Sequence, residues 1–205
     1  MKANSPLISV ILLAAGESKR MGEPKQLLPL GNSTIIEKTI DNYLNSSVME
    51  VILVVGHRSK DLISVISDKP VKIELNPDYS QGMSTSIIAG INNMDAASQG
   101  IMIALADQPF IDSRTIDYLI EEFGNRGKGI VIPSYRGKRG HPVIFGSKYK
   151  RSLLNLKGDV GGREIINANP DDVAEIEVEC FGITSDIDTK ESYFLKQQNF
   201  GEDEG

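Results

Sequence analysis

The sequence has little cysteine, no excess of positive charge and no long apolar run. Cys180 is the only cysteine among 205 residues, which excludes an internal disulfide, and we expect it to pack as a small buried hydrophobe. The formal net charge of -6 argues against a general binder of nucleic acid or of anionic membranes. No apolar run approaches the roughly 18 residues that span a membrane, and there is no signal-peptide pattern. We therefore expect a soluble, cytoplasmic protein.

Common nucleotide-binding and metal-binding patterns are also absent. The sequence contains neither a Walker A loop nor G-x-G-x-x-G, and the second absence disfavours a small-molecule oxidoreductase. The two histidines, His57 and His141, are too far apart in the sequence to suggest a metal-binding pair. His57 follows a predicted strand, and the sequence leaves open whether it lines a pocket or has a structural or surface role.

Strand-like and helix-like segments alternate along the chain. Apolar runs rich in β-branched residues predict buried strands, and apolar residues at helical spacing predict amphipathic helices. The predicted strands cover residues 7–13, 51–55, 71–75, 101–106, 129–133, 142–145 and 173–178. The predicted helices cover residues 34–46, 59–67, 84–93, 112–123, 148–156, 162–168 and 190–198. This order indicates an α/β fold with a mostly parallel sheet and helices on both faces.

Local signals refine the ends of these elements. Thr34 with Glu37 predicts a capping box, and Gly124 is expected to end the helix that begins near residue 112. Because there is no linker or repeat, we expect one domain over residues 1–200 and a disordered acidic tail at residues 201–205.

The segments that follow the strands are the candidate site, because ligands bind at the carboxyl ends of parallel strands. Residues 13–25, after the first strand, combine small residues, two glycines and three cations. Small residues let the backbone approach phosphates, and Arg20 and Lys25 can meet the phosphate charge. The alternative is a solvated, basic surface loop.

The third and fourth strands are followed by polar segments. Residues 76–86 open a helix, where hydroxyls and N-terminal amides suit a nucleobase or ribose, although Ser84 would also serve as a plain helix cap. Asp107 ends the fourth strand. A carboxylate beside a triphosphate needs a hard cation between them, so Asp107 is a candidate Mg²⁺ ligand. A simple helix-entry turn built on Asp107 and Pro109 is the alternative.

Two later segments carry charge. Asp186 and Asp188 alternate along an extended segment and should lie on one side of it, where one binds a cation and the other caps the last helix. Asp186 is the preferred ligand. The basic turn at residues 136–140, which includes Arg139 and precedes His141, either meets a phosphorylated acceptor or is a solvated tip.

The pattern LAAG-x-S-x-RMG-x-x-K at residues 13–25, followed by QLLPL, resembles the signature of the MobA/MocA-like nucleotidyltransferases. Later segments resemble that family's motifs in the same order: GMSTS at residues 82–86, DQP at 107–109, GHP at 140–142, GD-x-G-x-R at 158–163 and DIDT at 186–189. The resemblance covers essentially the whole chain. The first motif is highly specific, and the later ones are weak singly and strong together.

The resemblance implies a single-domain, Rossmann-like nucleotidyltransferase fold with a triphosphate in the first loop and Mg²⁺ as cofactor. It points to catalytic roles for Arg20, Lys25 and Asp107, and to metal binding by Asp107 and Asp186. The implied nucleotide-binding residues are Leu13, Ala14, Ala15, Gly16, Lys25, Gly82, Ser84 and Thr85. His141 and Arg139 are the candidates for binding the acceptor.

The start of the first loop bears on the choice of nucleotide. Guanylyltransferases of this group resemble Leu-Ala-Gly-Gly there, whereas cytidylyltransferases have Ala-Ala-Gly, as at Ala14, Ala15 and Gly16. The Ala15 methyl would narrow a base pocket, which favours CTP over GTP. With this choice of nucleotide, the resemblance implies a reaction that moves CMP from CTP to the terminal phosphate of molybdopterin. That phosphate is already ionised and needs no general base.

Other functions remain open on the sequence. One is a cytidylyl-, uridylyl- or guanylyltransferase for a sugar phosphate or an isoprenoid alcohol phosphate. Another is a non-catalytic chaperone that brings the molybdenum cofactor to a molybdoenzyme of the xanthine dehydrogenase type, which serves purine breakdown. Release of pyrophosphate from CTP and molybdopterin would separate these alternatives from the expected reaction.

Overall fold

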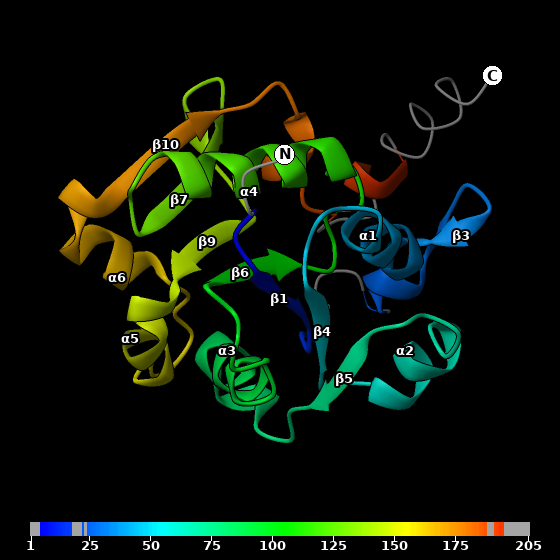
Figure 1. The fold of residues 1–205 in the computed structure, drawn as a ribbon. Helices are drawn as coiled ribbons and strands as arrows, with labels where there is room; N and C mark the ends of the chain where they lie inside the picture. Colours follow the sequence, from blue (N-terminus) through cyan, green and yellow to red (C-terminus); the bar gives the residue numbers. More distant parts are fainter. Residues whose placement is uncertain (1–4, 18–21, 23, 188–190, 195–205) are drawn as a thin grey trace.

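One mixed β-sheet with helices on both faces forms the body of the protein (Figure 1). The structure is a computed structural model and describes residues 5–17, 22, 24–187 and 191–194. Its main sheet has 8 strands in the order β10-β7-β9-β6-β1-β4-β5, with β8 paired to β7. These strands are β1 (Ile8–Ala14), β4 (Glu50–Val55), β5 (Lys72–Leu75), β6 (Gly100–Leu105), β7 (Ile130–Tyr135), β8 (Lys138–Arg139), β9 (Val143–Gly146) and β10 (Val173–Glu177).

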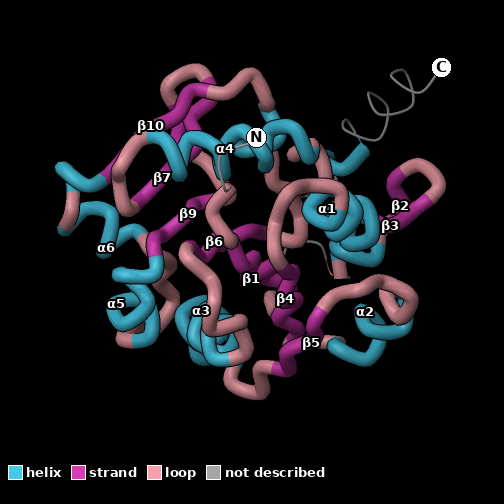
Figure 2. Tube along the Cα trace, in the orientation of Figure 1, coloured by secondary structure: helices cyan, strands magenta, loops and turns pink. Residues whose placement is uncertain are grey.

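The helices alternate with the strands, as the sequence predicts. The α-helices are α1 (Ile35–Leu44), α2 (Ser59–Val65), α3 (Met83–Asn92), α4 (Ser113–Asn125), α5 (Lys150–Leu154) and α6 (Arg163–Ala168). The short 3₁₀ helices are η1 (Lys25–Leu27), η2 (Tyr79–Gln81), η3 (Ser147–Tyr149), η4 (Pro170–Asp172) and η5 (Phe181–Thr184). Figure 2 shows α3 and α5 on one side of the strands and α1 and α4 on the other. None of the helices in the described part of the chain has both the length and the apolarity to cross a bilayer.

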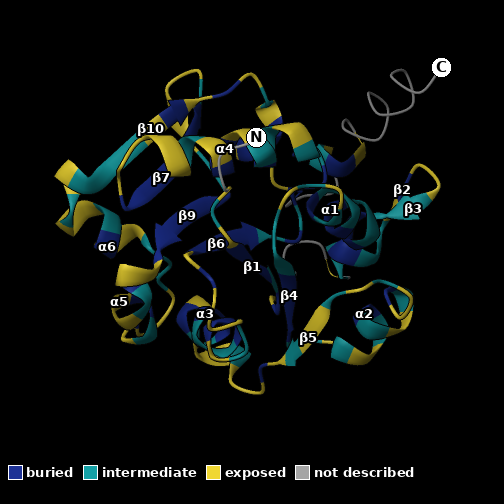
Figure 3. Cartoon of the chain, viewed as in Figure 1, coloured by how far each residue is buried: buried dark blue, intermediate teal, exposed yellow. Residues whose placement is uncertain are grey.

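Alternation along the central strands produces two separate hydrophobic cores. In β1, Val10 and Leu12 belong to the core under α1, α2 and α4, whereas Ile11 belongs to the core under α3, α5 and α6. Successive side chains of a strand point to opposite faces, so a strand buried on both faces must be apolar throughout. Figure 3 accordingly shows β1, β4 and β6 buried.

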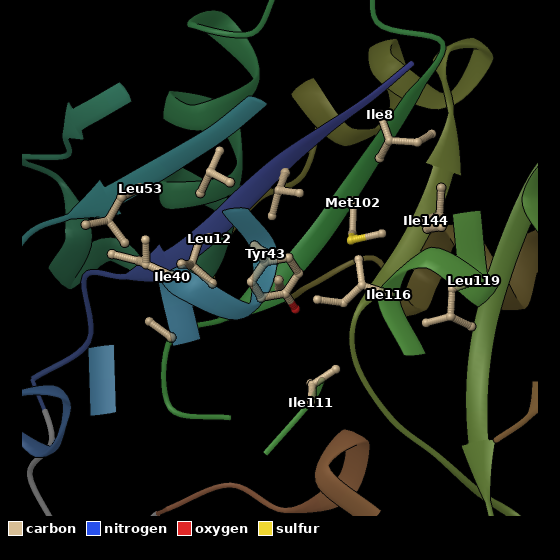
Figure 4. Close-up of a cluster of buried hydrophobic side chains, with 14 of the residues drawn as sticks. Ile8, Leu12, Ile40, Tyr43, Leu53, Met102, Ile111, Ile116, Leu119 and Ile144 are labelled. Atoms are coloured by element: carbon tan, nitrogen blue, oxygen red, sulfur yellow. The ribbon is translucent and has the colours of Figure 1, made fainter. Parts of the chain in front are cut away.

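The first of these cores packs around the ring of Tyr43 from α1 (Figure 4). The helix that carries this ring begins at the predicted capping box: the Thr34 backbone N–H donates to Glu37 Oε2 at 2.8 Å, and the Glu37 N–H donates to Thr34 Oγ1 at 3.4 Å. The Tyr43 hydroxyl is buried with no hydrogen-bond partner in the described part of the chain, and this burial raises the pKa of Tyr43.

Strand directions decide where the site lies. The pairs β1–β4, β1–β6, β4–β5 and β7–β10 are parallel, whereas β9 runs antiparallel to both β6 and β7. Because β9 is inserted between two strands that it opposes, β7 points the same way as β6. The carboxyl ends of all strands of the main sheet except β8 and β9 therefore meet at one edge.

The structure corrects one sequence-based expectation, at Gly124, and adds detail to others. Gly124 lies inside α4, which ends at Asn125, and the glycine with positive φ after the helix is Gly127 at 62°. Cys180 is partly buried, and its thiol donates to the Phe110 carbonyl at 3.3 Å. The small hairpin of β2 (Pro29–Leu30) and β3 (Ser33–Thr34) was not predicted. The predicted helix at residues 190–198 lies largely outside the described residues.

Candidate active site

The centre of the carboxyl edge is formed by the ends of β1, β4 and β6. The Ala106 N–H, just after β6, donates to the Leu13 carbonyl at 3.1 Å. The His57 N–H, just after β4, donates to the Ala15 carbonyl at 3.3 Å. The start of the first loop is therefore held by hydrogen bonds to both neighbouring strand ends, and this fixes the direction in which the backbone leaves β1.

Gly16 is a glycine that the protein itself does not require. Among the residues that the structure describes, a Cβ atom built there would meet nothing within 4 Å, and Gly16 has no positive φ. Gly82 is the opposite case, because its φ is 114° and a Cβ would lie 2.5 Å from the backbone of Gly158. When neither conformation nor packing demands glycine, the close approach of a ligand to the backbone is the remaining physical reason for it. Gly16 is exposed, so its backbone is accessible to a ligand at the carboxyl edge of the sheet.

Lys25 and Asp107 form an ion pair at this edge. Lys25 begins η1, Asp107 follows β6, and the ammonium Nζ contacts carboxylate Oδ2. Each side chain is only 13% exposed, so water screens the pair less than it would screen a pair on the open surface. Two residues that the sequence assigns to different tasks, phosphate binding and metal binding, are therefore direct neighbours.

Gln108 connects the end of β6 to the segment after η5. Its side chain is buried, and Nε2 donates to Asp186 Oδ1 at 2.6 Å and to the Ile183 carbonyl at 3.2 Å. The same Ile183 carbonyl accepts from the His141 N–H at 3.0 Å. This network brings the later acidic segment and the Gly-His-Pro segment to the position of Asp107.

His141 lies in the site, whereas Arg139 does not. Burial lowers the pKa of His141, and the charges of Asp186 and then Asp107 oppose that shift. His141 is therefore mainly neutral at pH 7. Arg139 instead pairs with Glu175 of β10 at 2.7 Å, and both of these side chains are largely solvated. The two acceptor-binding candidates thus have different surroundings: the charges of Asp186 and Asp107 act on His141, whereas Arg139 pairs with Glu175.

The first turn of α3 already has protein partners. The Met83 N–H donates to Asp159 Oδ1 at 3.2 Å, and the Ser84 N–H donates to the Gly158 carbonyl at 3.2 Å. Gly82 fits against the same turn because it has no side chain. Two amides that the sequence offers to a ligand are thus engaged by residues of the later GD-x-G-x-R segment.

The Thr85 hydroxyl is similarly engaged. It lies within donating distance of the Gly82 carbonyl, at 2.9 Å, and it accepts from Asn76 Nδ2 at 2.9 Å. Asn76 is buried and follows β5, so this bond fixes the start of α3 relative to the sheet. The Thr85 hydroxyl therefore has a structural role, because it links the start of α3 to the residue that follows β5.

The remaining site candidates divide into those described and those outside. Ala14 and Ala15 are buried at the end of β1, and Leu13 is partly buried there. Arg20 and Asp188 lie outside the described residues. Sequence reasoning assigned no role to Gln108 or Asp159, although both belong to motifs that carry the family resemblance.

Two carboxylates, Asp107 and Asp186, form the candidate metal-binding group. In the part of the chain that the structure describes, no three His, Cys, Asp or Glu side chains converge to hold an ion alone. Mg²⁺ is commonly bound by one or two carboxylates with water and substrate phosphates. The donor set therefore fits Mg²⁺ bound together with a triphosphate, and does not fit a metal cage made wholly by protein.

The comparison with protein families now decides the assignment. The MobA-like NTP transferase domain matches residues 10–173. The chain belongs to the MobA-like NTP transferase family. The matched range runs from within β1 to the start of β10 and therefore contains the first loop, Lys25, Asp107 and His141. The resemblance predicted from the motifs is confirmed, and so is the α/β nucleotidyltransferase fold.

Individual relatives are similar to this chain over almost their full length. Nicotine blue oxidoreductase of Paenarthrobacter nicotinovorans is 30% identical, over 92% of this chain and 96% of that protein. Molybdenum cofactor cytidylyltransferase of Escherichia coli is 28% identical, over 95% and 98%. The crystal structure of the Mycobacterium sp. strain JC1 homologue of Mycobacterium tuberculosis Rv0371c superposes with a TM-score of 0.87, at 28% identity, over 98% and 99%.

Proposed function

We propose that this nucleotidyltransferase moves CMP from CTP to the terminal phosphate of molybdopterin and releases pyrophosphate. The observation that carries the proposal is the Lys25–Asp107 ion pair at the carboxyl edge of the sheet, the edge at which the exposed backbone of Gly16 follows β1. The 28% identity to a molybdenum cofactor cytidylyltransferase, which extends over both chains, supports this choice of reaction.

The first loop holds the triphosphate in this proposal. Its backbone N–H groups around Gly16 face the β- and γ-phosphates, and Lys25 turns from Asp107 to the phosphates. An oxygen of the acceptor phosphate attacks the α-phosphorus and forms a new P–O bond. The bond from the α-phosphorus to the bridging oxygen breaks, and pyrophosphate leaves with the electron pair. Lys25, with Arg20, stabilises the charge that develops on pyrophosphate.

Asp107 and Asp186 would hold Mg²⁺ against the triphosphate. When bound, Mg²⁺ neutralises phosphate charge and fixes the orientation of the α-phosphate. The protein's own contribution is to place the two carboxylates and to release Asp107 from its ion pair with Lys25. No general base is required, because a phosphate monoester has a second pKa near ~6 and is largely dianionic at neutral pH.

His141 is the acceptor-binding candidate that remains in the site. Burial lowers its pKa, so a neutral ring with one N–H donor meets the acceptor without adding a cation. Arg139, which pairs with Glu175 on the outer strand, would have to leave that partner to take part. We therefore assign acceptor contact to His141 in preference to Arg139.

Cytidine is favoured by Ala15, the residue at the third position of the first loop. The Ala15 side chain is buried, and its carbonyl is tied to His57, so its methyl group cannot move aside easily. A fixed methyl narrows the adjacent base site and favours a pyrimidine over a larger purine. Ala15→Gly is therefore expected to shift the ratio of CTP to GTP turnover toward GTP.

The direct test is a screen of the four nucleoside triphosphates with molybdopterin and Mg²⁺, scored by pyrophosphate release. CTP with molybdopterin should give pyrophosphate, and omission of either molybdopterin or Mg²⁺ should stop it. If pyrophosphate is released with a sugar phosphate or an isoprenoid alcohol phosphate and not with molybdopterin, that phosphate is the acceptor substrate instead of molybdopterin. CTP binding without any turnover would support the chaperone alternative, in which the protein delivers the cofactor to a molybdoenzyme.

A second candidate function comes from the relative named nicotine blue oxidoreductase, at 30% identity. The name of that relative indicates a redox reaction, although this chain lacks the dinucleotide-binding pattern G-x-G-x-x-G. The same screen should therefore include NADH and NADPH. Saturable binding of either, with no heat from CTP in the presence of Mg²⁺, would favour the redox function.

A further inference from the structure

The segment from Ile183 to Ile187 is attached to the loop after β6 at three points. The Ile187 N–H donates to the Asp107 carbonyl at 3.2 Å. At the other end, Gln108 Nε2 donates to the Ile183 carbonyl at 3.2 Å, and the same nitrogen donates to Asp186 Oδ1 at 2.6 Å. Asp186 therefore lies between two backbone anchors, and a side-chain amide donates to its carboxylate.

Asp186 itself is exposed, so burial does not hold its carboxylate in place. Gln108 is different, because its side chain is only 1% exposed. An exposed carboxylate moves freely among rotamers unless a fixed donor restrains it. The buried amide of Gln108 is such a donor, because its Nε2 reaches Asp186 Oδ1 at 2.6 Å.

The other half of the Gln108 amide is not satisfied. Its Oε1 is buried, and no hydrogen bond to it is found in the described structure. A buried acceptor without a partner opposes folding, so a residue kept only for stability would be better replaced by an apolar side chain of similar shape. Folding does not explain why an amide stands here, whereas orientation of Asp186 does.

We propose that Gln108 is a positioning residue that holds the Asp186 carboxylate beside Asp107, so that both face one divalent cation. The inference rests on the proposed function, in which these two carboxylates bind the metal. Partners that orient metal ligands typically change metal affinity by about 10- to 100-fold when removed. Gln108 would act through Asp186 and would touch neither the substrate nor the ion.

Two substitutions test the role of the amide. Gln108→Met keeps the length and volume of the side chain but removes the donor, and Gln108→Asn keeps the amide but shortens its reach. Gln99→Met is the control, because Gln99 lies at the opposite edge of the sheet, where its Oε1 accepts from the Leu7 N–H at 3.0 Å. Mn²⁺, which gives an EPR signal when free, serves as the probe ion in the presence of CTP.

The expected result is a loss of Mn²⁺ affinity of about 10- to 100-fold in both Gln108 variants and none in Gln99→Met. Melting temperatures should stay within about 4 °C of the wild type, because the Ile183 carbonyl keeps its bond from His141 and the exposed Asp186 can turn to water. CTP affinity measured in a chelator should not change.

A double-mutant cycle with Asp186→Asn separates positioning from a general structural effect. If Gln108 acts through Asp186, Gln108→Met should cause no further loss of Mn²⁺ affinity in the Asp186→Asn background. Equal Mn²⁺ affinity in wild type and Gln108→Met would overturn the positioning role alone. Additive losses in the cycle would also overturn it. A wild-type protein that binds no Mn²⁺ with CTP would overturn the proposed metal site, and the role of Gln108 with it.

Discussion

The ion pair between Lys25 and Asp107 leads to a prediction with two opposite signs. If Asp107 binds a divalent cation, the Lys25 ammonium occupies the same side of that carboxylate in the ligand-free protein. Replacement of this lysine by Met should therefore raise metal affinity without nucleotide, and should lower transferase activity with nucleotide. An ordinary loss of structure would lower both quantities.

The size of the first effect follows from the geometry. Two unit charges about 4 Å apart interact by about 4 kcal/mol at an effective dielectric constant of about 20. The ammonium and carboxylate are each 13% exposed, so some water and salt screening remains, and we retain about a third of that energy. This leaves about 1.4 kcal/mol, which is about tenfold in affinity.

The assay is a Mn²⁺ titration of wild type and Lys25→Met by EPR, first without nucleotide and then with CTP. Lys148→Met is the control, since Lys148 also pairs with an aspartate, Asp172, at 2.6 Å, but on the far side of the fold. Without nucleotide, the Lys25 variant should bind Mn²⁺ about tenfold more tightly than wild type. Its turnover should fall by about 10²–10³-fold. If the variant binds Mn²⁺ no more tightly than wild type, the two cations do not compete for Asp107.

The remaining predictions concern glycines, acid stability and a helix cap. Gly16→Ala should leave the free energy of unfolding within about 0.5 kcal/mol of wild type, but calorimetry should show CTP binding weakened at least about tenfold. Gly82→Ala should instead lower the free energy of unfolding by roughly 1–3 kcal/mol, because the φ of Gly82 is 114°. The Lys148 hydrogen bond chiefly lowers the pKa of Asp172 from 3.8 to about 2, so its contribution is complete above pH 3.8 and is lost as the pH falls toward about 2. In urea unfolding, Asp172→Asn should therefore be less stable by about 1 kcal/mol, after allowance for solvent screening, only above that window; an equal difference at both ends would contradict the assignment. Thr34→Ala should lower the free energy of unfolding by about 1 kcal/mol, and no change would mean that the capping box contributes nothing.

The sequence predicts most of the sheet and helices because each element has a local cause. The apolar run of β1 and the capping box of α1 each lie within a dozen residues, so the local sequence pattern predicts both. The sequence does not show that α4 continues past Gly124 to Asn125, or that the glycine with positive φ after the helix is Gly127. The antiparallel direction of β9 has no sequence signal either, because direction depends on which neighbours a strand meets.

The candidate site shows the same limit. Post-strand position and charge pointed to Lys25 and Asp107 separately, and only folding reveals that they are partners. For Asp159, the motif was visible, but its bond to the first turn of α3 joins two distant segments. Long-range pairs of this kind are invisible to periodicity, which reports only on neighbours along the chain.

The bonds between the 158–159 turn and the start of α3 have a consequence for engineering. In a chimera that receives residues 157–162 from a relative, the incoming loop must also accept the hydrogen bond from the Ser84 N–H and pack against Gly82. A graft that ignores this would leave two amides of α3 without acceptors and would press a foreign side chain against Gly82. Loop exchange aimed at a new acceptor should therefore also transfer residues 82–85 from the same relative, so that the two contacting segments come from one protein.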